Sequence, residues 1–145
     1  MKKSTKQHCP FCGELAYHHQ IKPVTLHYKK QAITIDQPGF WCDACQEGVI
    51  GGDDRKATQK ALQTQRAEID GLLTPDQIKR IREKLKLTQH KAALLFGGGI
   101  NAFSRYERGE TPLPKSLHQL LILLDKHPTL AAELSHAKFK HAGHA

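Results

Sequence analysis

Apolar and polar side chains alternate along residues 23–36. The apolar positions are Val24, Leu26, Tyr28, Ala32, Ile33 and Ile35. Side chains two residues apart point to the same face of a strand, so this pattern favours strands with one buried face. Gln37-Pro38-Gly39 follows, and its Pro and Gly favour a turn. We predict a short antiparallel sheet that is closed by this tripeptide.

The pattern becomes helical at residues 53–69. Apolar residues occur there among polar ones, at Ala57, Ala61, Leu62 and Ile69. Asp53 or Asp54 is a suitable N-cap, because a carboxylate accepts hydrogen bonds from the free N–H groups of a first helical turn. We predict one amphipathic helix, and Gly71 is suited to end it.

Two further helices are predicted over residues 75–86 and 89–96. Their inward-facing residues are Ile78, Ile81, Leu85, Ala92, Ala93 and Phe96. Thr74-Pro75 is a suitable start for the first helix, and Thr88 caps the second. The glycines at 97–99 then permit a sharp turn, because glycine tolerates positive φ.

A short helix is predicted next, over residues 101–108, and Gly109 closes it. Phe103 faces the core on this helix, with Ile100 and Tyr106 beside it. A helix, a turn containing glycine and a second short helix are the layout of the helix-turn-helix DNA reader. The glycines therefore position a recognition helix.

A leucine-rich helix is predicted over residues 116–128. Its apolar stripe is Leu117, Leu120, Leu121 and Leu124. Ile122 and Leu123 fall outside that stripe, and either a following helix with Leu130 and Leu134 or a second copy of the chain covers them. We predict a homodimer through this C-terminal domain, because paired half-sites are how such short readers gain affinity.

Two cysteine pairs, Cys9-Pro-Phe-Cys12 and Cys42-Asp-Ala-Cys45, are separated by 29 residues. They offer four thiolates from two tight turns, which suits one tetrahedral Zn²⁺ in a closed structural site. Disulfides would need an oxidising compartment, and a thioredoxin-like pair would need a single C-x-x-C in a βαβ setting. Iron in a rubredoxin-like cage is a further alternative, although only the first pair is followed by glycine. We predict a single structural zinc.

These elements predict an α+β fold in two small domains. Residues 1–69 form a zinc-bound, β-rich domain with one helix, and residues 70–74 form a linker. Residues 75–136 form an all-α, five-helix domain of the helix-turn-helix class. Residues 137–145, which contain His141 and His144, are interpreted as a disordered tail.

Composition makes nucleic acid a candidate partner. The chain has 145 residues and a formal charge of +8, shared evenly between residues 1–66 and 67–145. Such a surplus favours nucleic acid or an acidic protein surface, with a solvated surface that binds nothing as the alternative. No apolar run approaches the roughly 20 residues that span a bilayer, and no signal-peptide pattern is present, so we predict a cytoplasmic protein without membrane contact.

Base contacts are predicted for Asn101 and Arg105. They are four residues apart and share one helix face, and they can pair with adenine and guanine respectively. Asn101 could instead serve as the N-cap of its own helix. Candidate phosphate contacts are Lys79 and Arg82, from the basic cluster of the helix predicted over residues 75–86, and the hydrogen-bond donors Gln89 and Ser104.

The chain resembles the MqsA-type antitoxins of bacterial toxin–antitoxin pairs. The resemblance is carried by both cysteine pairs, by the segment FGGGINAFSRYERG at residues 96–109 and by Leu124-Asp-Lys-His-Pro128. It implies an N-terminal zinc domain that docks on an mRNA-cleaving toxin. It also implies a C-terminal domain that dimerises on a palindromic operator, with Asn101 and Arg105 on the bases.

Other function classes are less well supported. We find no G-x-S-x-G or G-x-x-x-x-G-K-[ST] pattern, and four cysteines on one metal leave no open coordination position, so we predict no enzymatic activity. A stand-alone regulator whose zinc module is structural or senses metal or redox state remains an alternative. An RNA-binding zinc ribbon is another.

Overall fold

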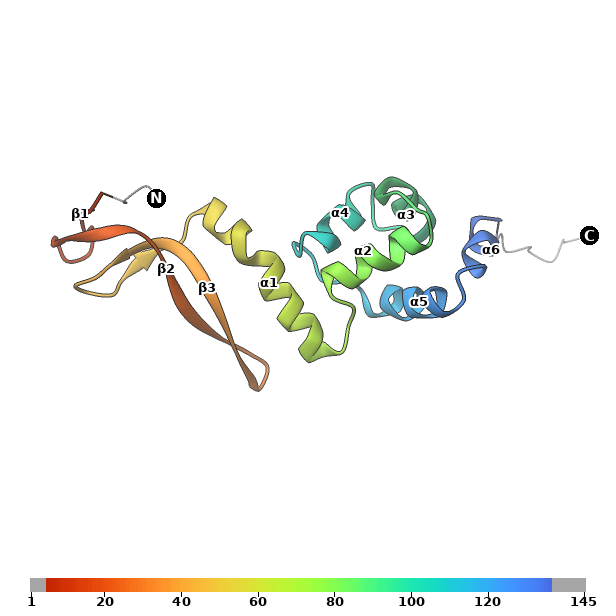
Figure 1. The fold of residues 1–145 in the computed structure, drawn as a ribbon, viewed down its shortest axis with the longest axis horizontal. Helices are drawn as coiled ribbons and strands as arrows, with labels where there is room; N and C mark the ends of the chain where they lie inside the picture. Colours follow the sequence, from red (N-terminus) through yellow and green to blue (C-terminus); the bar gives the residue numbers. More distant parts are fainter. Residues whose placement is uncertain (1–4, 137–145) are drawn as a thin grey trace, which may run out of the picture.

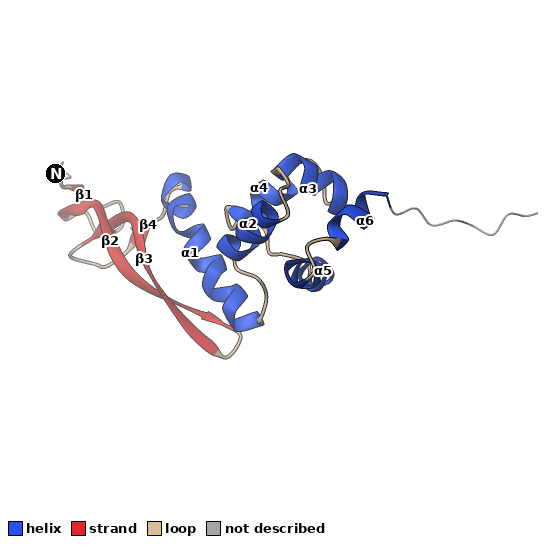
Figure 2. Ribbon diagram, turned by 45° about the vertical axis from the view of Figure 1, so that its right-hand side comes forward, coloured by secondary structure: helices blue, strands red, loops and turns tan. Residues whose placement is uncertain are grey.

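The computed structural model describes residues 5–136 and has an α+β fold, as predicted. A four-stranded antiparallel sheet comes first, in the order β1-β2-β3-β4, and six helices follow. The strands are β1 (Gln7–His8), β2 (Leu15–Tyr28), β3 (Gln31–Cys42) and β4 (Gly48–Val49). Figures 1 and 2 show an elongated molecule in which the first helix lies between the sheet and the other helices.

Strands β2 and β3 form a long hairpin whose register runs from Tyr17↔Cys42 to Tyr28↔Gln31. The predicted closure at Gln37-Pro38-Gly39 is wrong, because this tripeptide lies inside β3 and pairs with β2. The chain turns instead at Lys29, which has a φ of 53°. Pro38 is tolerated because β4 pairs only with the last part of β3, at Phe40 and Trp41, so on the β4 side of β3 no strand needs a donor at residue 38.

Helix α1 (Gly52–Asp70) covers one face of this hairpin. Ile33, Ile35, Gln37 and Gly39 are buried on that face at alternate positions of β3. The Gln37 side chain donates to the Asp54 carbonyl at 3.0 Å and accepts from the Thr58 hydroxyl at 2.8 Å. Gly51 is the N-cap of α1, with Asp53 and Asp54 in its first turn, so the predicted aspartate cap is not formed.

The apolar face predicted for this helix is also partly wrong. Ala57 and Ala61 are exposed, and Ala67 is the buried alanine of α1. The contact with the hairpin uses polar residues such as Thr58, so apolar spacing was a poor guide to the face that packs.

The helical half contains α2 (Pro75–Lys84), α3 (Gln89–Phe96), α4 (Ala102–Glu107), α5 (Lys115–Lys126) and α6 (Leu130–His136). Its core consists of Ile78, Ile81, Ala92, Ala102, Phe103, Tyr106, Leu113 and Leu121. Thr74 and Gln77 form a capping box at the start of α2, and Thr88 caps α3. The five helices agree with the predicted count.

The two halves touch where α4 ends. Gly109 is buried against α1, and a Cβ added there would lie 2.7 Å from the Cα of Lys60 and 3.1 Å from the carbonyl oxygen of Gln59. Lys60 also forms an ion pair with Asp76 of α2 at 2.6 Å. The connecting segment is held as well, because the Leu73 N–H donates to Nδ1 of His118 at 3.1 Å and Leu73 packs on the helical core.

We therefore expect Gly109→Ala to separate α1 from the end of α4. The new methyl group meets the backbone of α1, which cannot yield as a flexible side chain would. Small-angle X-ray scattering should report a larger radius of gyration. Gly71→Ala is the matched control, because Gly71 has a similar φ of 70° against 73° at Gly109 but has no atom within 4 Å of an added Cβ. Equal scattering curves for the two variants would contradict the expectation.

Candidate metal centre and nucleic-acid interface

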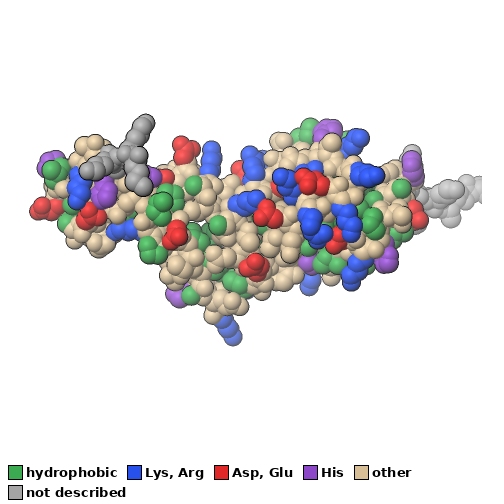
Figure 3. Space-filling model, viewed as in Figure 1, with side chains coloured by type: hydrophobic (Ala, Val, Ile, Leu, Met, Phe, Trp, Pro, Cys, Tyr) green, Lys and Arg blue, Asp and Glu red, His purple; other side chains and the backbone are tan. Residues whose placement is uncertain are grey.

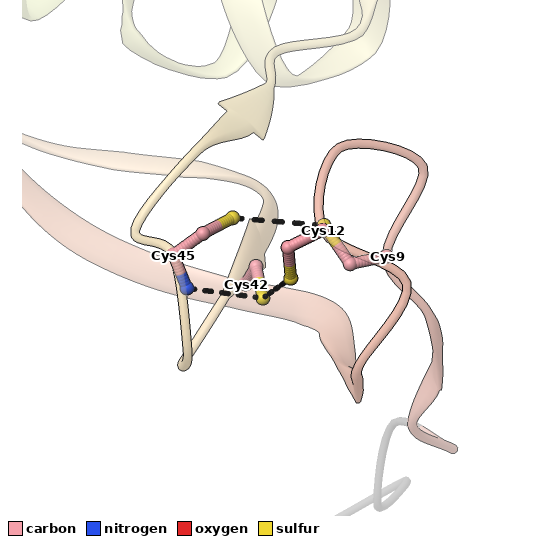
Figure 4. A group of neighbouring side chains, drawn as sticks. All are labelled: Cys9, Cys12, Cys42 and Cys45. Carbon is pink, nitrogen blue, oxygen red and sulfur yellow. Dashed lines mark hydrogen bonds between the residues drawn. The ribbon is translucent and has the colours of Figure 1, made fainter.

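The four cysteines lie close together at the end of the sheet opposite the β2–β3 turn (Figure 4). Cys9 and Cys12 lie in the turn between β1 and β2, whereas Cys42 ends β3 and Cys45 lies in the turn to β4. All four Sγ atoms lie within 4.8 Å of one another, and the pairs Cys9–Cys45 and Cys12–Cys42 are each 3.7 Å apart. A tetrahedral site with metal–sulfur bonds of about 2.3 Å has edges of about 3.8 Å. The donor set therefore fits a single metal ion.

The two cysteine turns have the same backbone geometry. The N–H of Gly13 donates to the Cys9 carbonyl at 2.9 Å, and the N–H of Gln46 donates to the Cys42 carbonyl at 3.0 Å. Gly13 has a φ of 81°, and Gln46 adopts the same left-handed region at 66°. The Gln46 side chain donates to the Asp43 carbonyl at 2.9 Å. The missing glycine noted in the sequence is thus replaced by a glutamine in the same conformation.

Backbone N–H groups point at the sulfur atoms, as a thiolate site requires. Phe11 donates to Sγ of Cys9 and Ala44 donates to Sγ of Cys42, each at 3.3 Å. Burial raises the pKa of Cys9, but hydrogen bonds from the backbone of Cys12 and Phe11 outweigh it and lower this pKa to about 7.

Cys45 behaves in the opposite way. A backbone hydrogen bond at Glu47 lowers its pKa, but burial and the other thiols raise the pKa of Cys45 to about 12. Cys9 and Cys45 therefore do not ionise together readily, and a cation among the cysteines would offset the repulsion between thiolates.

Asp43 ties the second cysteine turn to the sheet. Its carboxylate accepts from Nε2 of Gln20 at 3.1 Å and lies 3.0 Å from Nε2 of His18 and 3.2 Å from Nζ of Lys6. These hydrogen bonds lower the pKa of Asp43 to about 2. Sequence analysis missed this cluster, because nothing in the strand pattern marks His18 and Gln20 as neighbours of a residue more than 20 positions away.

Helices α2, α3 and α4 form the predicted helix-turn-helix arrangement. Phe103 of α4 and Ala92 of α3 are fully buried in the shared core. Between these helices, residues 97–99 all have positive φ. A Cβ at Gly98 would lie only 3.0 Å from the Cβ of Ala102, so this turn needs glycine for space as well as for conformation.

Asn101 and Arg105 are both exposed. Arg105 lies on α4, and Asn101 lies directly before this helix. Asn101 occupies the N-cap position but makes no capping hydrogen bond with its side chain. The amide is therefore not engaged as the sequence alternative supposed. Lys79 is also exposed, and Ser104 is half-buried. The DNA contacts of these residues remain predictions.

Arg82 and Gln89 are bonded within the domain. The side chain of Arg82 is 11% exposed, and its Nε donates to Oε1 of Glu107 at 2.7 Å while a terminal nitrogen donates to the Leu87 carbonyl at 2.8 Å. Nε2 of Gln89 donates to the other Glu107 oxygen. The Glu107 side chain is 5% exposed. Sequence analysis gave no role to Glu107, which joins α2, α3 and α4.

Ile100 contradicts its predicted place in the core. It is 65% exposed, although Phe103 and Tyr106 are buried as expected. The helix begins only at Ala102, and the glycine turn leaves Ile100 outside the packed face.

Lys and Arg side chains gather over the helical half of the face seen in Figure 3, interspersed with acidic ones. Part of this charge is paired: Arg80 and Lys84 of α2 lie 3.4 Å and 3.0 Å from Asp125 of α5. Lys79 forms no ion pair within the described residues, so its charge is available to a binding partner.

A family model described as the antitoxin component of a bacterial toxin–antitoxin system, MqsA, matches residues 7–135. The chain belongs to the MqsA antitoxin family. The match includes both the cysteine cluster and the helix-turn-helix, so the resemblance seen in the sequence is confirmed.

A curated relative agrees with this MqsA assignment. The chain is 36% identical over 129 residues to Antitoxin MqsA of Escherichia coli (strain K12). The matched region covers 87% of this chain and 98% of that protein. Membership of the MqsA family supports an antitoxin role with a toxin partner. Among the described residues, no helix is long and apolar enough to cross a membrane.

Proposed function

We propose that this chain is an antitoxin with two separate binding modules. The N-terminal sheet, held by one zinc ion on Cys9, Cys12, Cys42 and Cys45, docks on an mRNA-cleaving toxin. The helical half binds duplex DNA and represses transcription. The observation that carries the proposal is the family match across residues 7–135, which includes both the cysteine cluster and the helix-turn-helix elements.

Zinc is the proposed ion because of the donor set. Four sulfur ligands that lie within 4.8 Å of one another, two pairs of them 3.7 Å apart, suit the tetrahedral coordination of closed structural zinc sites. Such a site holds the fold and leaves no position for substrate, so the proposal includes no catalytic role.

The proposed DNA interface is centred on α4. Asn101 and Arg105 project as exposed side chains, and Asn and Arg suit adenine and guanine in the major groove. Lys79 on α2 and Ser104 on α4 itself are proposed to contact the phosphate backbone. For Arg82 and Gln89 we propose a positioning role, because both donate to Glu107.

A second copy of the chain is proposed to bind at the C-terminal helices. An apolar groove between α5 and α6 is lined by Leu120, Leu123, Leu124, Leu130, Glu133 and Leu134. Leu123 is 55% exposed and lies outside the buried stripe of α5, so the described residues of one copy leave it uncovered. A twofold dimer would cover it and place two copies of α4 on a palindromic operator.

Arg105→Ala is expected to weaken operator binding by about 1–3 kcal/mol, because one bidentate base contact is lost. Fluorescence anisotropy with the preferred duplex and with a random-sequence duplex measures both affinity and discrimination. Metal content should stay at one ion per chain, because Arg105 lies in the other half. An Arg105→Ala variant that separates the two duplexes as well as the parent does would exclude α4 as the reading helix.

The toxin partner is tested by purification with the neighbouring gene product. A small basic protein that co-purifies with the chain, and whose ribonuclease activity falls on binding, would support the antitoxin function. Equal or better binding of duplex RNA than duplex DNA would instead favour an RNA-binding protein. If the adjacent reading frames encode no ribonuclease, a stand-alone regulator becomes the better interpretation.

A further inference from the structure

Ile100 is a large apolar side chain in an unusual place. It is 65% exposed at the end of the glycine turn, directly before Asn101. Its neighbours in the chain are Gly99 and Asn101, neither of which has an apolar side chain that could extend it into a larger patch. Leu94, which is 75% exposed, lines a separate groove with Leu87 and Leu95. Ile100 therefore needs its own explanation.

Ile100 lies directly before Asn101, in the turn that leads into α4. The Ala102 N–H donates to the Gly99 carbonyl at 3.0 Å and the Arg105 N–H donates to the Asn101 carbonyl at 3.0 Å, so residues 100 and 101 stay next to the first turn of the helix. Ile100, Asn101 and Arg105 are all exposed, whereas Phe103 and Tyr106 of α4 are buried. A duplex that meets Asn101 would therefore meet the adjacent Ile100 as well.

We propose that Ile100 is a specificity-determining residue that packs against the C5-methyl group of a thymine. This inference rests on the DNA-binding function proposed above. Thymine is the base whose major-groove edge carries a methyl group, and apolar side chains recognise it. Consecutive Cα atoms are about 3.8 Å apart and base pairs about 3.4 Å, so Ile100 reaches the base pair read by Asn101 or the next one.

The proposal explains why an apolar residue is exposed at this point. Asn101 selects adenine through hydrogen bonds. Contact between Ile100 and the thymine methyl group shields both of these apolar groups from water. Together Asn101 and Ile100 would read a short A·T-containing step in each half-site. Arg105 would read a guanine further along the groove.

Replacing single thymines with deoxyuridine tests this contact, because the change removes only the C5-methyl group. The probe is the duplex that the parent chain selects from a random library. At one thymine position in each half-site, replacement with deoxyuridine should weaken binding of the parent chain about threefold to tenfold. A factor of this size corresponds to the free energy of burying about one methyl group. Ile100→Ala should weaken binding of the unmodified duplex by a similar factor.

The two changes should not be additive. In Ile100→Ala, deoxyuridine at that thymine should alter the Kd by no more than about twofold, because the partner of the methyl group is already gone. Ile100→Val should keep the dependence on the methyl group. Leu94→Ala is the matched control, an exposed leucine truncated in the same domain, and should keep the full dependence. Thermal unfolding should be unchanged in Ile100→Ala, because the side chain is exposed in the free protein.

The outcomes separate this inference from the function on which it rests. If Arg105→Ala loses discrimination but deoxyuridine costs the parent and Ile100→Ala equally, only the thymine contact is wrong. The same holds if no deoxyuridine position affects the parent. If the parent selects no sequence from the library, both the DNA-binding function and the role of Ile100 are overturned.

Discussion

Removal of the metal with a chelator is expected to unfold the N-terminal sheet and to leave α2–α6 folded. The buried cluster at the cysteine end consists of Cys9, Tyr17 and Cys42, with Ala16, Phe40 and Cys45 packed against it. Half of this cluster is therefore made of the proposed ligands. In the described strands, Ile33 and Ile35 are the other buried apolar residues, which is too little apolar area to hold a sheet in water.

The size of the effect follows from the folding role of such ions. Structural zinc contributes about 10–16 kcal/mol in small zinc-bound peptides, which is more than a sheet of this size can gain from packing. Without the ion, the thiols reprotonate and the two turns lose their common anchor. The helical half has its own core around Phe103 and should keep its protection.

Hydrogen exchange resolved by segment measures the two halves separately. After chelation, amides of β2 and β3 should exchange at near-unprotected rates, whereas amides of α2 and α5 should be unaffected. Cys42→Ser should reproduce this result without a chelator. Gln46→Gly is the control in the same turn, because it keeps all four thiols and suits the φ of 66°, so it should retain one metal per chain. Protection of β2 and β3 that survives chelation would show that the metal is dispensable for the fold.

Features with a local physical cause were predictable from the sequence. Thr74 and Thr88 mark the helix starts because capping depends on residues three positions away, and the predicted helices over 75–86 and 89–96 are close to α2 and α3. The cysteine spacing likewise predicted the cluster, because a C-x-x-C turn presents both thiols to one point.

Features that depend on distant partners were not predictable. The hairpin continues through Pro38 because Ile21 of β2 pairs there, and no local signal reports that pairing. Helix α1 packs on the hairpin through Gln37 and Thr58, two polar residues that an apolar-face analysis does not consider. Ile100 appeared to be a core residue because helical spacing was extended one turn too early, into the glycine turn.

Glu107 is the clearest case of a residue whose role only the structure reveals. Its carboxylate is 5% exposed and accepts hydrogen bonds from Arg82, which is 25 positions away, and from Gln89. In sequence it is one acidic residue between a tyrosine and an arginine. In the fold it is the shared acceptor of three helices, and two candidate phosphate contacts are oriented by it.

We expect Glu107→Ala to lower the free energy of unfolding of the helical half by about 3–5 kcal/mol, because the Arg82 side chain, which is 11% exposed, is left without its carboxylate partner. Chemical denaturation monitored by circular dichroism measures the loss. Glu110→Ala is the matched control, since Glu110 lies three residues further along and pairs with Arg108 at a more exposed site, at 2.8 Å. That surface pair should contribute less than about 1 kcal/mol. Equal losses in the two variants would show that the Arg82–Glu107 pair does not hold the domain together.

The double variant Arg82→Met/Glu107→Leu separates stability from DNA binding. It removes both charges and replaces them with apolar side chains, so much of the stability lost in Glu107→Ala should return. Gln89 still lacks its acceptor in this variant and is no longer oriented. We therefore expect a folded domain whose DNA affinity stays below that of the parent. The loss should be similar for preferred and random duplexes, because contacts to the phosphate backbone do not depend on the DNA sequence. Full recovery of affinity together with stability would show that Glu107 contributes to the fold alone and does not position Gln89 for a phosphate.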